Sequence, residues 1–307
     1  MKDPSFDIIE MKETIDIISY LTEIPPINYE ELEFVKYISK GSFGVTEERR
    51  YRGTKVALKL LLDNSLHSTN EFLREAKLLH QCQHPEYVVE LIGICRNQKG
   101  LVMELMECGL DQYLKGWVNF LNHFTWDIRA SIALKIIKAI NHLHNLGVVH
   151  LDIKSLNFLY SKDFIKIADF GQCRLIVDEW DPKAYMKAML PLGEVGTVAW
   201  MAPEVANQRV QLAHIKKVDI YSFGAIMSEL DSLGYPNGDT SPRVFRKKVS
   251  SREIKHKFSK NAPFWFRNIA EKCLRYEPEH RPTAPEVVDM LIKAIHDNFH
   301  QNKRFQN

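Results

Sequence analysis

One stretch of the sequence, HLDIKSLN at 150–157, concentrates side chains that could act on a phosphate group. Asp152 could take the proton of an incoming hydroxyl, and Lys154 could steady the transferring phosphate. Asn157 and the later Asp169, which opens a DFG triplet, could hold Mg2+, because this ion prefers carboxylate and amide oxygens. In the sequence, no cluster of histidines and cysteines competes for another metal. The joint occurrence of these motifs, in this order, predicts phosphoryl transfer.

A glycine-containing segment, GSFG at 41–44, lies between two strand-like runs. Glycines let backbone N–H groups approach a phosphate closely, because no side chain intervenes. Two glycines three residues apart are more often a hairpin turn. Taken alone, the segment favours the turn, with a phosphate-binding loop as the alternative.

A lysine and a glutamate, which lie in neighbouring predicted elements, are suited to pair with each other. Lys59 lies in the apolar run VALKLLL, where a lysine by itself would be read as a snorkelling edge residue. Glu75 falls inside the apolar stripe of a helix predicted over 69–80. Because an inward-facing carboxylate is costly unless it is paired, the sequence predicts a buried Lys59–Glu75 ion pair.

The first part of the chain is mostly strand-like. Its runs are LEFVKYI, RYRGTKVALKLLL, VVELIGIC and GLVMELM, and a helix over 69–80 interrupts them. Ser68 and Glu71 fit a capping box that would open this helix. Before residue 31, the residues Ile8, Met11, Ile15 and Ile18 recur at helical spacing, which predicts a short amphipathic helix packed on its own chain.

Helical patterns dominate beyond residue 110. The longest covers 127–144, and the last opens with a capping box of Thr283 and Glu286. Two strand-like pieces, NFLY and FIKIA, interrupt the helices. A β-rich part followed by a helical part indicates the α+β class, since strands and helices do not alternate.

Composition excludes several classes of protein. The 307 residues are 45% hydrophobic and 26% charged, as in ordinary globular proteins. With 41 basic and 39 acidic residues the net charge is +2, which disfavours nucleic-acid binding. Five cysteines without a CxxC motif disfavour a disulfide framework and a zinc site. The sequence has no signal-like start and no run of about 18 apolar residues, so a cytoplasmic protein without membrane insertion is expected.

With HLDIKSLNF, DFG and GTVAWMAPE, the sequence resembles the eukaryotic protein-kinase family over about residues 31–295. The resemblance implies a bilobal fold, with a small β-rich N-lobe that carries one major helix and a larger, mostly α-helical C-lobe. It implies ATP and protein substrates as partners, with Mg2+ as the metal and Mn2+ as an alternative. The corresponding division is an N-terminal extension (1–30), the N-lobe (31–103), the hinge and C-lobe (104–295), and a C-terminal tail (296–307).

The resemblance also implies individual roles. Lys59, positioned by Glu75, would hold the α- and β-phosphates. Asp219 would form hydrogen bonds to the backbone of the catalytic loop, which is the stretch at 150–157 that carries Asp152. A further pair, Glu204 with Arg281, would be structural. The remaining residues implied to bind ATP, including the hinge and the residue guarding the adenine pocket, are Ser39, Gly41, Phe43, Gly44, Thr46, Ala57, Met103, Glu104, Met106 and Leu159.

Within the family, GTVAWMAPE and HLDIKSLNF resemble the tyrosine-kinase-like group of serine/threonine kinases. Lys154 and Thr197 match the serine/threonine type, and dual specificity stays open. An active serine/threonine kinase is the leading hypothesis, and a catalytically weak scaffold with a kinase fold is the alternative. A small-molecule kinase is disfavoured by the WMAPE segment. A monomer is favoured.

Three positions depart from the family pattern. Ser39 replaces the first glycine of the phosphate loop, and Thr46 replaces the valine over the adenine. Leu151 replaces the arginine that receives an activating phosphate, and between Gly171 and Gly196 the only hydroxyl-bearing side chain is Tyr185. Ser39 and Thr46 are expected to tune the affinity for ATP without abolishing it. Leu151 and the lack of serine and threonine between Gly171 and Gly196 predict activity that is independent of phosphorylation of this segment.

Overall fold

The structure, a computed structural model, describes residues 22–40, 44–61, 65–162, 164–177, 197–236, 244, 247–248, 251–253 and 256–300. The predicted N-terminal helix, Gly41, Phe43 and Tyr185 lie outside these ranges. The chain divides into two compact units. The first comprises Met1–Glu107 with Ala168–Gln172, and the second comprises Cys108–Ile167 with Cys173–Asn307.

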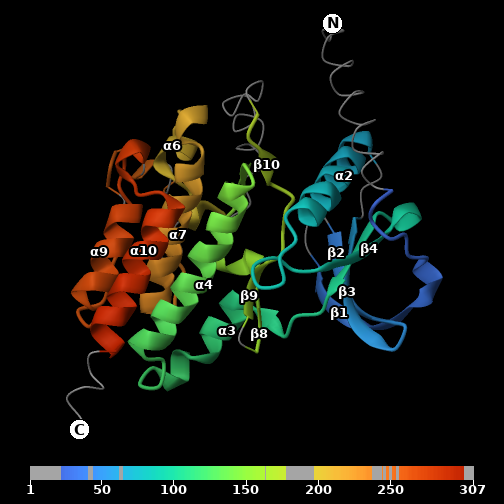
Figure 1. Cartoon of the computed structure of the whole chain (residues 1–307), viewed down its shortest axis with the longest axis horizontal. Coiled ribbons are helices and arrows are strands. Elements are labelled where there is room, and N and C mark those ends of the chain that lie inside the picture. The colour runs from blue at the N-terminus through green and yellow to red at the C-terminus, as the bar shows by residue number, and fades with distance from the viewer. Residues whose placement is uncertain are drawn as a thin grey trace, which may run out of the picture. The chain divides into compact units, whose positions relative to one another are not determined.

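The first unit is built on a five-stranded antiparallel sheet in the order β1-β2-β3-β5-β4 (Figure 1). Its strands are β1 (Leu32–Lys40), β2 (Gly44–Tyr51), β3 (Thr54–Leu61), β4 (Leu91–Cys95) and β5 (Gly100–Glu104). The run RYRGTKVALKLLL, predicted as one strand-like piece, is divided between β2 and β3. Arg52 and Gly53 form the turn with φ of 47° and 84°, because a two-residue hairpin of this kind needs positive φ at both positions.

Among the described residues of the first unit, one long helix is present, α2 (Leu66–Gln81). The predicted capping box at Ser68 and Glu71 is wrong, since the helix begins earlier. Ser65 is the N-cap, and its hydroxyl accepts a hydrogen bond from the Ser68 backbone N–H at 3.1 Å. The predicted apolar stripe is correct, and its residues Phe72, Ala76 and Leu79 are buried.

The core of the first unit gathers residues from both the sheet and the segment that leads into it. One cluster consists of Ile27, Leu32, Val56, Leu58, Cys95 and Val102. Before β1, the Ile27 N–H donates to the Ile94 carbonyl and the Ile94 N–H donates to the Pro25 carbonyl, both at 3.0 Å. The chain around residues 25–27 therefore extends the β4 edge of the sheet.

The second unit is mostly helical (Figure 1), and its described residues form three short antiparallel strand pairings. Its helices are α3 (Leu110–Gly116), α4 (Trp126–Asn145), α6 (Pro203–Ala206), α7 (Lys216–Ser232), α9 (Phe264–Cys273) and α10 (Ala284–Ile295), and its strands are β6 (Cys108–Gly109), β7 (Val148–Val149), β8 (Phe158–Ser161), β9 (Phe164–Ile167) and β10 (Arg174–Leu175). The long helix and the two strand-like pieces predicted from sequence are confirmed within two residues at each end. The capping box of Thr283 and Glu286 is also present.

Helix α7 lies at the centre of the helical unit. Every residue from Val218 to Asp231 is buried, and the helix packs against α4 and α9. A helix that is buried all round has to satisfy its polar side chains internally. The polar groups of α7 are therefore available to hold neighbouring loops. A β-rich unit and a helical unit together confirm the predicted α+β class.

Candidate active site

Lys59 and Glu75 form the ion pair that the sequence predicts. Lys59 projects from β3 and Glu75 from α2, and their Nζ and Oε1 atoms are 2.7 Å apart. The Glu75 side chain is only 5% exposed. Burial raises the pKa of the Glu75 carboxyl, and Lys59 opposes that shift. Glu75 on α2 therefore fixes the position of the Lys59 ammonium on β3.

Asp169 brings a second carboxylate to the same lysine. Its Oδ1 atom lies 3.1 Å from Lys59 Nζ and also accepts the Gly171 backbone N–H at 3.1 Å. Burial disfavours the ammonium, but the charges of Asp169 and Glu75 outweigh it and raise the pKa of Lys59 above its ordinary value. The first unit thus holds a permanently charged lysine beside a carboxylate that is 45% exposed.

In the second unit, three further predicted residues lie together. Lys154 Nζ is 2.7 Å from Asp152 Oδ2. The Asn157 side-chain amide donates to the Asp152 backbone carbonyl at 2.8 Å and to its Oδ2 atom at 2.9 Å. Since the amide nitrogen is engaged, the Asn157 Oδ1 atom is the one suited to a metal.

The loop that carries Asp152 is held by Asp219 on α7, as the resemblance implies. The Asp219 carboxylate accepts the backbone N–H groups of His150 at 2.9 Å and Leu151 at 2.8 Å. Its Oδ2 atom also lies 2.9 Å from Nε2 of His144. Burial would raise the pKa of Asp219, but the hydrogen bond and charge of His144 lower it below the ordinary value.

A second buried ion pair, Glu204 with Arg281, holds α6 in the helical unit. Arg281 contacts both oxygens of Glu204, with Nη1–Oε1 at 2.6 Å and Nη2–Oε2 at 2.7 Å. The guanidinium also donates to the carbonyls of Arg275, Tyr276 and Lys217. Bidentate geometry and complete hydrogen bonding make this a stable way to bury a charge pair.

The strand register aligns several of the residues implied to bind ATP. Ser39 lies opposite Thr46 across β1 and β2, and Thr46 lies opposite Lys59 across β2 and β3. At Gly44 an added Cβ would stand 2.3 Å from the Leu60 carbonyl oxygen, so only glycine fits there. The two departures at Ser39 and Thr46 therefore share a row with the predicted phosphate-binding lysine.

The other residues implied to bind adenine are buried or semi-buried. Ala57 lies directly opposite Met103 in the sheet, and both are buried. Glu104 ends β5, and Met106 follows it as a buried residue. Leu159 is on β8 in the second unit, opposite Gly109.

The donor set suits Mg2+ better than a transition metal. Within the described ranges, no group of three or more His, Cys, Asp and Glu side chains gathers to hold an ion. A carboxylate from Asp169 and an amide oxygen from Asn157 are hard ligands, and Mg2+ commonly takes its remaining ligands from water and phosphate. Each of the two residues therefore offers an oxygen of the kind that Mg2+ prefers.

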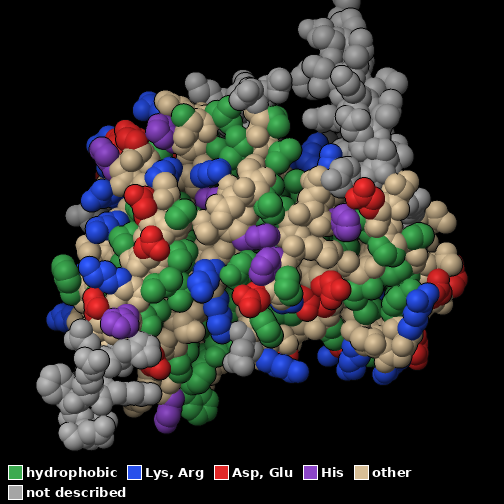
Figure 2. Space-filling view, viewed as in Figure 1, with side chains coloured by type: hydrophobic (Ala, Val, Ile, Leu, Met, Phe, Trp, Pro, Cys, Tyr) green, Lys and Arg blue, Asp and Glu red, His purple; other side chains and the backbone are tan. Residues whose placement is uncertain are grey.

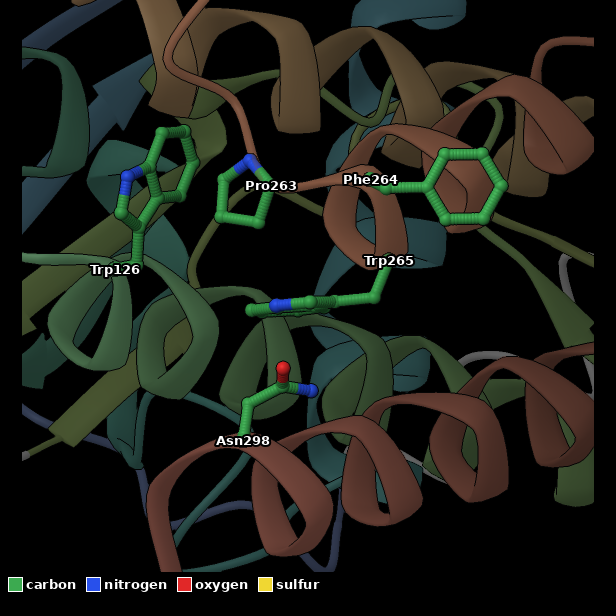
Figure 3. A pocket seen from close by; sticks show the side chains of 5 residues that line it. All are labelled: Trp126, Pro263, Phe264, Trp265 and Asn298. Carbon is green, nitrogen blue, oxygen red and sulfur yellow. The ribbon is translucent and has the colours of Figure 1, made fainter. Parts of the chain in front are cut away.

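One cavity of the helical unit lies apart from the predicted site residues. On the face shown in Figure 2, basic and acidic side chains are interspersed rather than gathered by sign. A cavity of about 530 Å³ is lined by Trp126, Pro263, Phe264, Trp265 and Asn298 (Figure 3). None of the predicted site residues lines it. None of the five cysteines, all of which the structure describes, forms a disulfide, and none of the described helices is long and apolar enough to cross a membrane.

Sequence reasoning missed two buried polar residues of this region, His144 and Glu229. His144 ends α4 facing Asp219, and Glu229 lies within the buried part of α7. Both could have been found by the pattern that identified Glu75, which is a polar residue inside the apolar pattern of a helix.

Comparison with known proteins finds several serine/threonine-protein kinases that are similar to this chain. The chain is 30% identical over 271 residues to the serine/threonine-protein kinase CTR1 of Arabidopsis thaliana, covering 86% of this chain and 32% of that protein. It is 31% identical to the RasGEF domain-containing serine/threonine-protein kinase X of Dictyostelium discoideum, over 86% and 27% of the two lengths. It is 27% identical to the serine/threonine-protein kinase STY17 of Arabidopsis thaliana, over 93% and 50%. The chain thus spans half or less of the length of each of these relatives.

A family profile described as the protein kinase domain matches residues 32–291, which is most of the chain. The match covers the strands that carry Lys59, the helix that carries Glu75, and the loop and helix that carry Asp152 and Asp219. The chain belongs to the protein kinase family.

Proposed function

We propose that the chain is an ATP- and magnesium-dependent protein serine/threonine kinase. The observation that carries this proposal is the Lys59 ammonium, held at 2.7 Å by Glu75 and at 3.1 Å by Asp169. A fully charged lysine fixed beside an exposed carboxylate suits the phosphates and metal of a nucleotide.

Each charged residue has a proposed task. Lys59, positioned by Glu75, binds the α- and β-phosphates. Asp152 orients the substrate hydroxyl and takes its proton, while Lys154 stabilises the transferring γ-phosphate. Asn157 and Asp169 would hold Mg2+, which when bound neutralises charge on the phosphate oxygens.

The nucleotide-binding residues follow the resemblance. We assign the phosphate loop to Ser39, Gly41, Phe43, Gly44 and Thr46. Contacts to the adenine are assigned to Ala57, Leu159 and Met103 and to the hinge residues Glu104 and Met106. The N-lobe is assigned to residues 31–103 and the C-lobe, with the hinge, to 104–295.

Serine/threonine specificity is supported by Lys154 and Thr197, and by the serine/threonine-protein kinases to which the chain is similar. Proteins are the proposed substrates, and the proposed location is the cytoplasm. A monomer is the proposed form.

The segment between Gly171 and Gly196 is called the activation segment below. The surroundings of Leu151 support kinase activity that does not depend on phosphorylation of this segment. Its side chain packs against a buried apolar cluster that includes Val149, Ala202 and Val205. Its backbone is left-handed, with φ of 65°. An apolar side chain in this setting offers no charge to a phosphate, so the loop is held by packing and by Asp219 instead.

The test is incubation with γ-labelled ATP, Mg2+ and a generic protein substrate, followed by phosphoamino-acid analysis. Label on serine or threonine with wild type, but not with Asp152→Asn, supports the proposal. ATP binding without transfer by wild type would instead support the scaffold alternative, which Leu151, Ser39 and Thr46 motivate. Removal of Mg2+ by a chelator should abolish transfer.

A further inference from the structure

Positive charge is concentrated in one stretch of the sequence, residues 243–260. Eight residues of this stretch are basic and one, Glu253, is acidic, so its net charge is +7 with histidine neutral. The whole chain carries only +2, so the remaining 289 residues carry a net charge of −5. A charge of one sign that is gathered in this way creates a local field, which the small net charge of the chain does not reveal.

Five basic residues of this stretch are described and exposed, and we call them the basic surface: Lys247, Lys248, Arg252, Lys257 and Lys260. Within the part of the chain that the structure describes, none of the four lysines forms an ion pair. By contrast, Lys115 of the same unit has a carboxylate of Asp111 2.9 Å away. The four exposed ammonium groups are therefore available to a ligand of opposite charge.

Hydrogen bonds to α7 hold the second half of the stretch in place. The ring nitrogens of His256 lie 3.2 Å and 3.3 Å from two hydroxyls of that helix. The Ser259 hydroxyl donates to the Asp231 carboxylate, also on α7, at 2.7 Å. Lys257 and Lys260 each directly follow one of these held residues. Their charges are therefore presented from a fixed backbone, which lowers the entropy cost of binding a partner.

Arg252 connects the basic surface to the end of α6. Its guanidinium carbon lies 4.4 Å from the centre of the Tyr276 ring, and its Nη2 atom lies 2.8 Å from Oε1 of Glu277. The Tyr276 hydroxyl accepts a hydrogen bond at 3.1 Å from the side-chain amide of Asn207, which is the C-cap of α6. The loop that carries Asp152 belongs to the same unit. A protein bound at the basic surface is therefore held on the unit that carries the proposed proton acceptor.

The distribution of charge along the chain favours a short acidic partner. A long polyanion, such as RNA or an anionic membrane, would extend past the basic surface and also meet residues whose net charge is negative. A short run of Asp and Glu would meet the basic surface alone. Carboxylates of a protein segment are therefore the partner that these charges fit.

We propose that the basic surface docks a short acidic segment of the protein substrate, outside the segment that is phosphorylated. The inference rests on the proposed kinase function and deepens it, because it names a class of substrate, which is proteins that carry a run of Asp or Glu. Docking on the unit that carries Asp152 raises the effective concentration of the substrate hydroxyl there. The effect should therefore fall on the KM for the protein substrate.

Direct binding tests the surface without using activity. The probe is a fluorescein-labelled peptide of ten glutamates, and a labelled peptide of ten glutamines is its neutral control. In fluorescence anisotropy, the wild-type chain should bind the glutamate peptide at least tenfold more tightly than the glutamine peptide. Addition of about 0.5 M NaCl should remove this difference, because salt screens exposed charges.

Charge reversal locates the binding. Lys247→Glu combined with Lys248→Glu should weaken binding of the glutamate peptide at least fivefold. Arg267→Glu combined with Lys293→Glu is the matched control, because it makes the same change in charge at exposed residues of α9 and α10. The control should bind within twofold of wild type. A thermal melt of both double variants checks that they are folded, and the salt dependence of the wild type is a test that needs no variant.

Steady-state kinetics test whether the docked protein is a substrate. One generic protein substrate carries a tail of ten glutamates or of ten glutamines on a Gly/Ser linker of about 20 residues, whose ends lie roughly 25 Å apart on average. Wild type should show a KM at least fivefold lower for the glutamate-tailed substrate, with kcat for the two substrates within twofold. The lysine double variant should lose this preference and keep its KM for ATP.

The outcomes separate this inference from the proposed function. Equal binding of the two peptides, or equal losses in the lysine variant and the control, would overturn the docking surface. Tighter binding of oligouridylate, or of vesicles of phosphatidylserine and phosphatidylcholine in equal parts, would overturn the assignment to a protein segment. Lysine-dependent binding without a lower KM would overturn the substrate role. Lysine-dependent binding with no transfer by wild type to either substrate would establish the acidic docking and reject the kinase function.

Discussion

The two units hold their charged groups in different ways. In the sheet unit, Lys59 and Asp169 are 25% and 45% exposed, and one ion pair to α2 positions the lysine. In the helical unit, Asp219 and Arg281 have fully buried side chains with several hydrogen bonds each. The first arrangement presents charge to a ligand, and the second fixes the backbone.

This difference predicts which substitutions reduce activity and which reduce stability. A charge that faces a ligand can be removed at a modest cost in stability, because water or a proton can compensate. A buried charge that satisfies backbone groups cannot be removed without leaving those groups unpaired. We therefore expect variants of the sheet unit to lose activity and variants of the helical anchors to lose stability.

The largest effect is expected when the buried Glu204–Arg281 pair is broken. Glu204→Gln leaves the Arg281 charge buried without its carboxylate, which should lower the free energy of unfolding by about 3–5 kcal/mol. Urea unfolding measures the change. The matched control is Glu277→Gln, whose partner Arg252 lies 2.8 Å away at the surface, and which should cost less than about 1 kcal/mol. Equal losses for both variants would remove the distinction between buried and exposed pairs.

Lys59→Met tests the opposite prediction for the sheet unit. The chain should stay folded, because burial already raises the pKa of Glu75 and lets it take up a proton when its partner is lost. Transfer should fall by about 10²-fold or more, which corresponds to roughly 3 kcal/mol of transition-state stabilisation. Steady-state kinetics and a thermal melt are the measurements. Lys55→Met is the control, because Lys55 is on the same strand and its side chain is 56% exposed. Full activity of folded Lys59→Met would show that the wrong lysine is assigned.

His256 supplies a smaller, pH-dependent effect in the helical unit. Its ring nitrogens lie 3.2 Å from the Tyr221 hydroxyl and 3.3 Å from the Ser228 hydroxyl. Burial lowers the pKa of His256 to about 4, so the folded state keeps it neutral while the unfolded chain binds a proton near pH 6.5. Its contribution is therefore complete above about pH 6.5 and is lost as the pH falls towards 4.

His256→Gln should remove that contribution to the pH dependence. Between pH 7 and 4.5, the wild type should lose about 1–3 kcal/mol more stability than the variant. Denaturant unfolding at several pH values gives both curves. Parallel curves would show that His256 does not titrate differently on unfolding.

The smallest effect is expected from the activation segment. Because Leu151 offers no charge to a phosphate, phosphatase treatment and Tyr185→Phe should each leave the transfer rate within tenfold of wild type, or about 1.4 kcal/mol. Initial rates on an added substrate measure this. A larger drop after either treatment would mean that phosphorylation controls the enzyme.

The sequence predicted those features that depend on a local pattern or on a pair of oppositely charged residues. The helix over 127–144 followed from its period, and the Lys59–Glu75 pair followed from a carboxylate on an apolar face. The anchors Asp219 and Glu204 came from the resemblance, since nothing local shows which distant groups they meet.

Each error and each missed residue has a physical cause. Four polar residues follow one another from Ser68 to Glu71, and their spacing fits a capping box although Ser65 begins the helix one turn earlier. Arg52 and Gly53 form a turn of only two residues, which leaves little interruption in the strand pattern. His144 and Glu229 bond to residues far away in the sequence, so only the folded chain brings their partners to them.

The most direct test compares two isosteric changes, Asp152→Asn and Asp219→Asn. Asp152→Asn should reduce transfer from ATP by about 10²-fold or more, because the proton acceptor is lost, while the free energy of unfolding changes by less than about 1.5 kcal/mol. Asp219→Asn should lower that free energy by about 2–4 kcal/mol, because an amide cannot accept all the N–H groups that the carboxylate accepts. Unfolding curves and single-turnover transfer on the two proteins decide the matter. Undiminished transfer by Asp152→Asn, or unchanged stability of Asp219→Asn, would contradict the account.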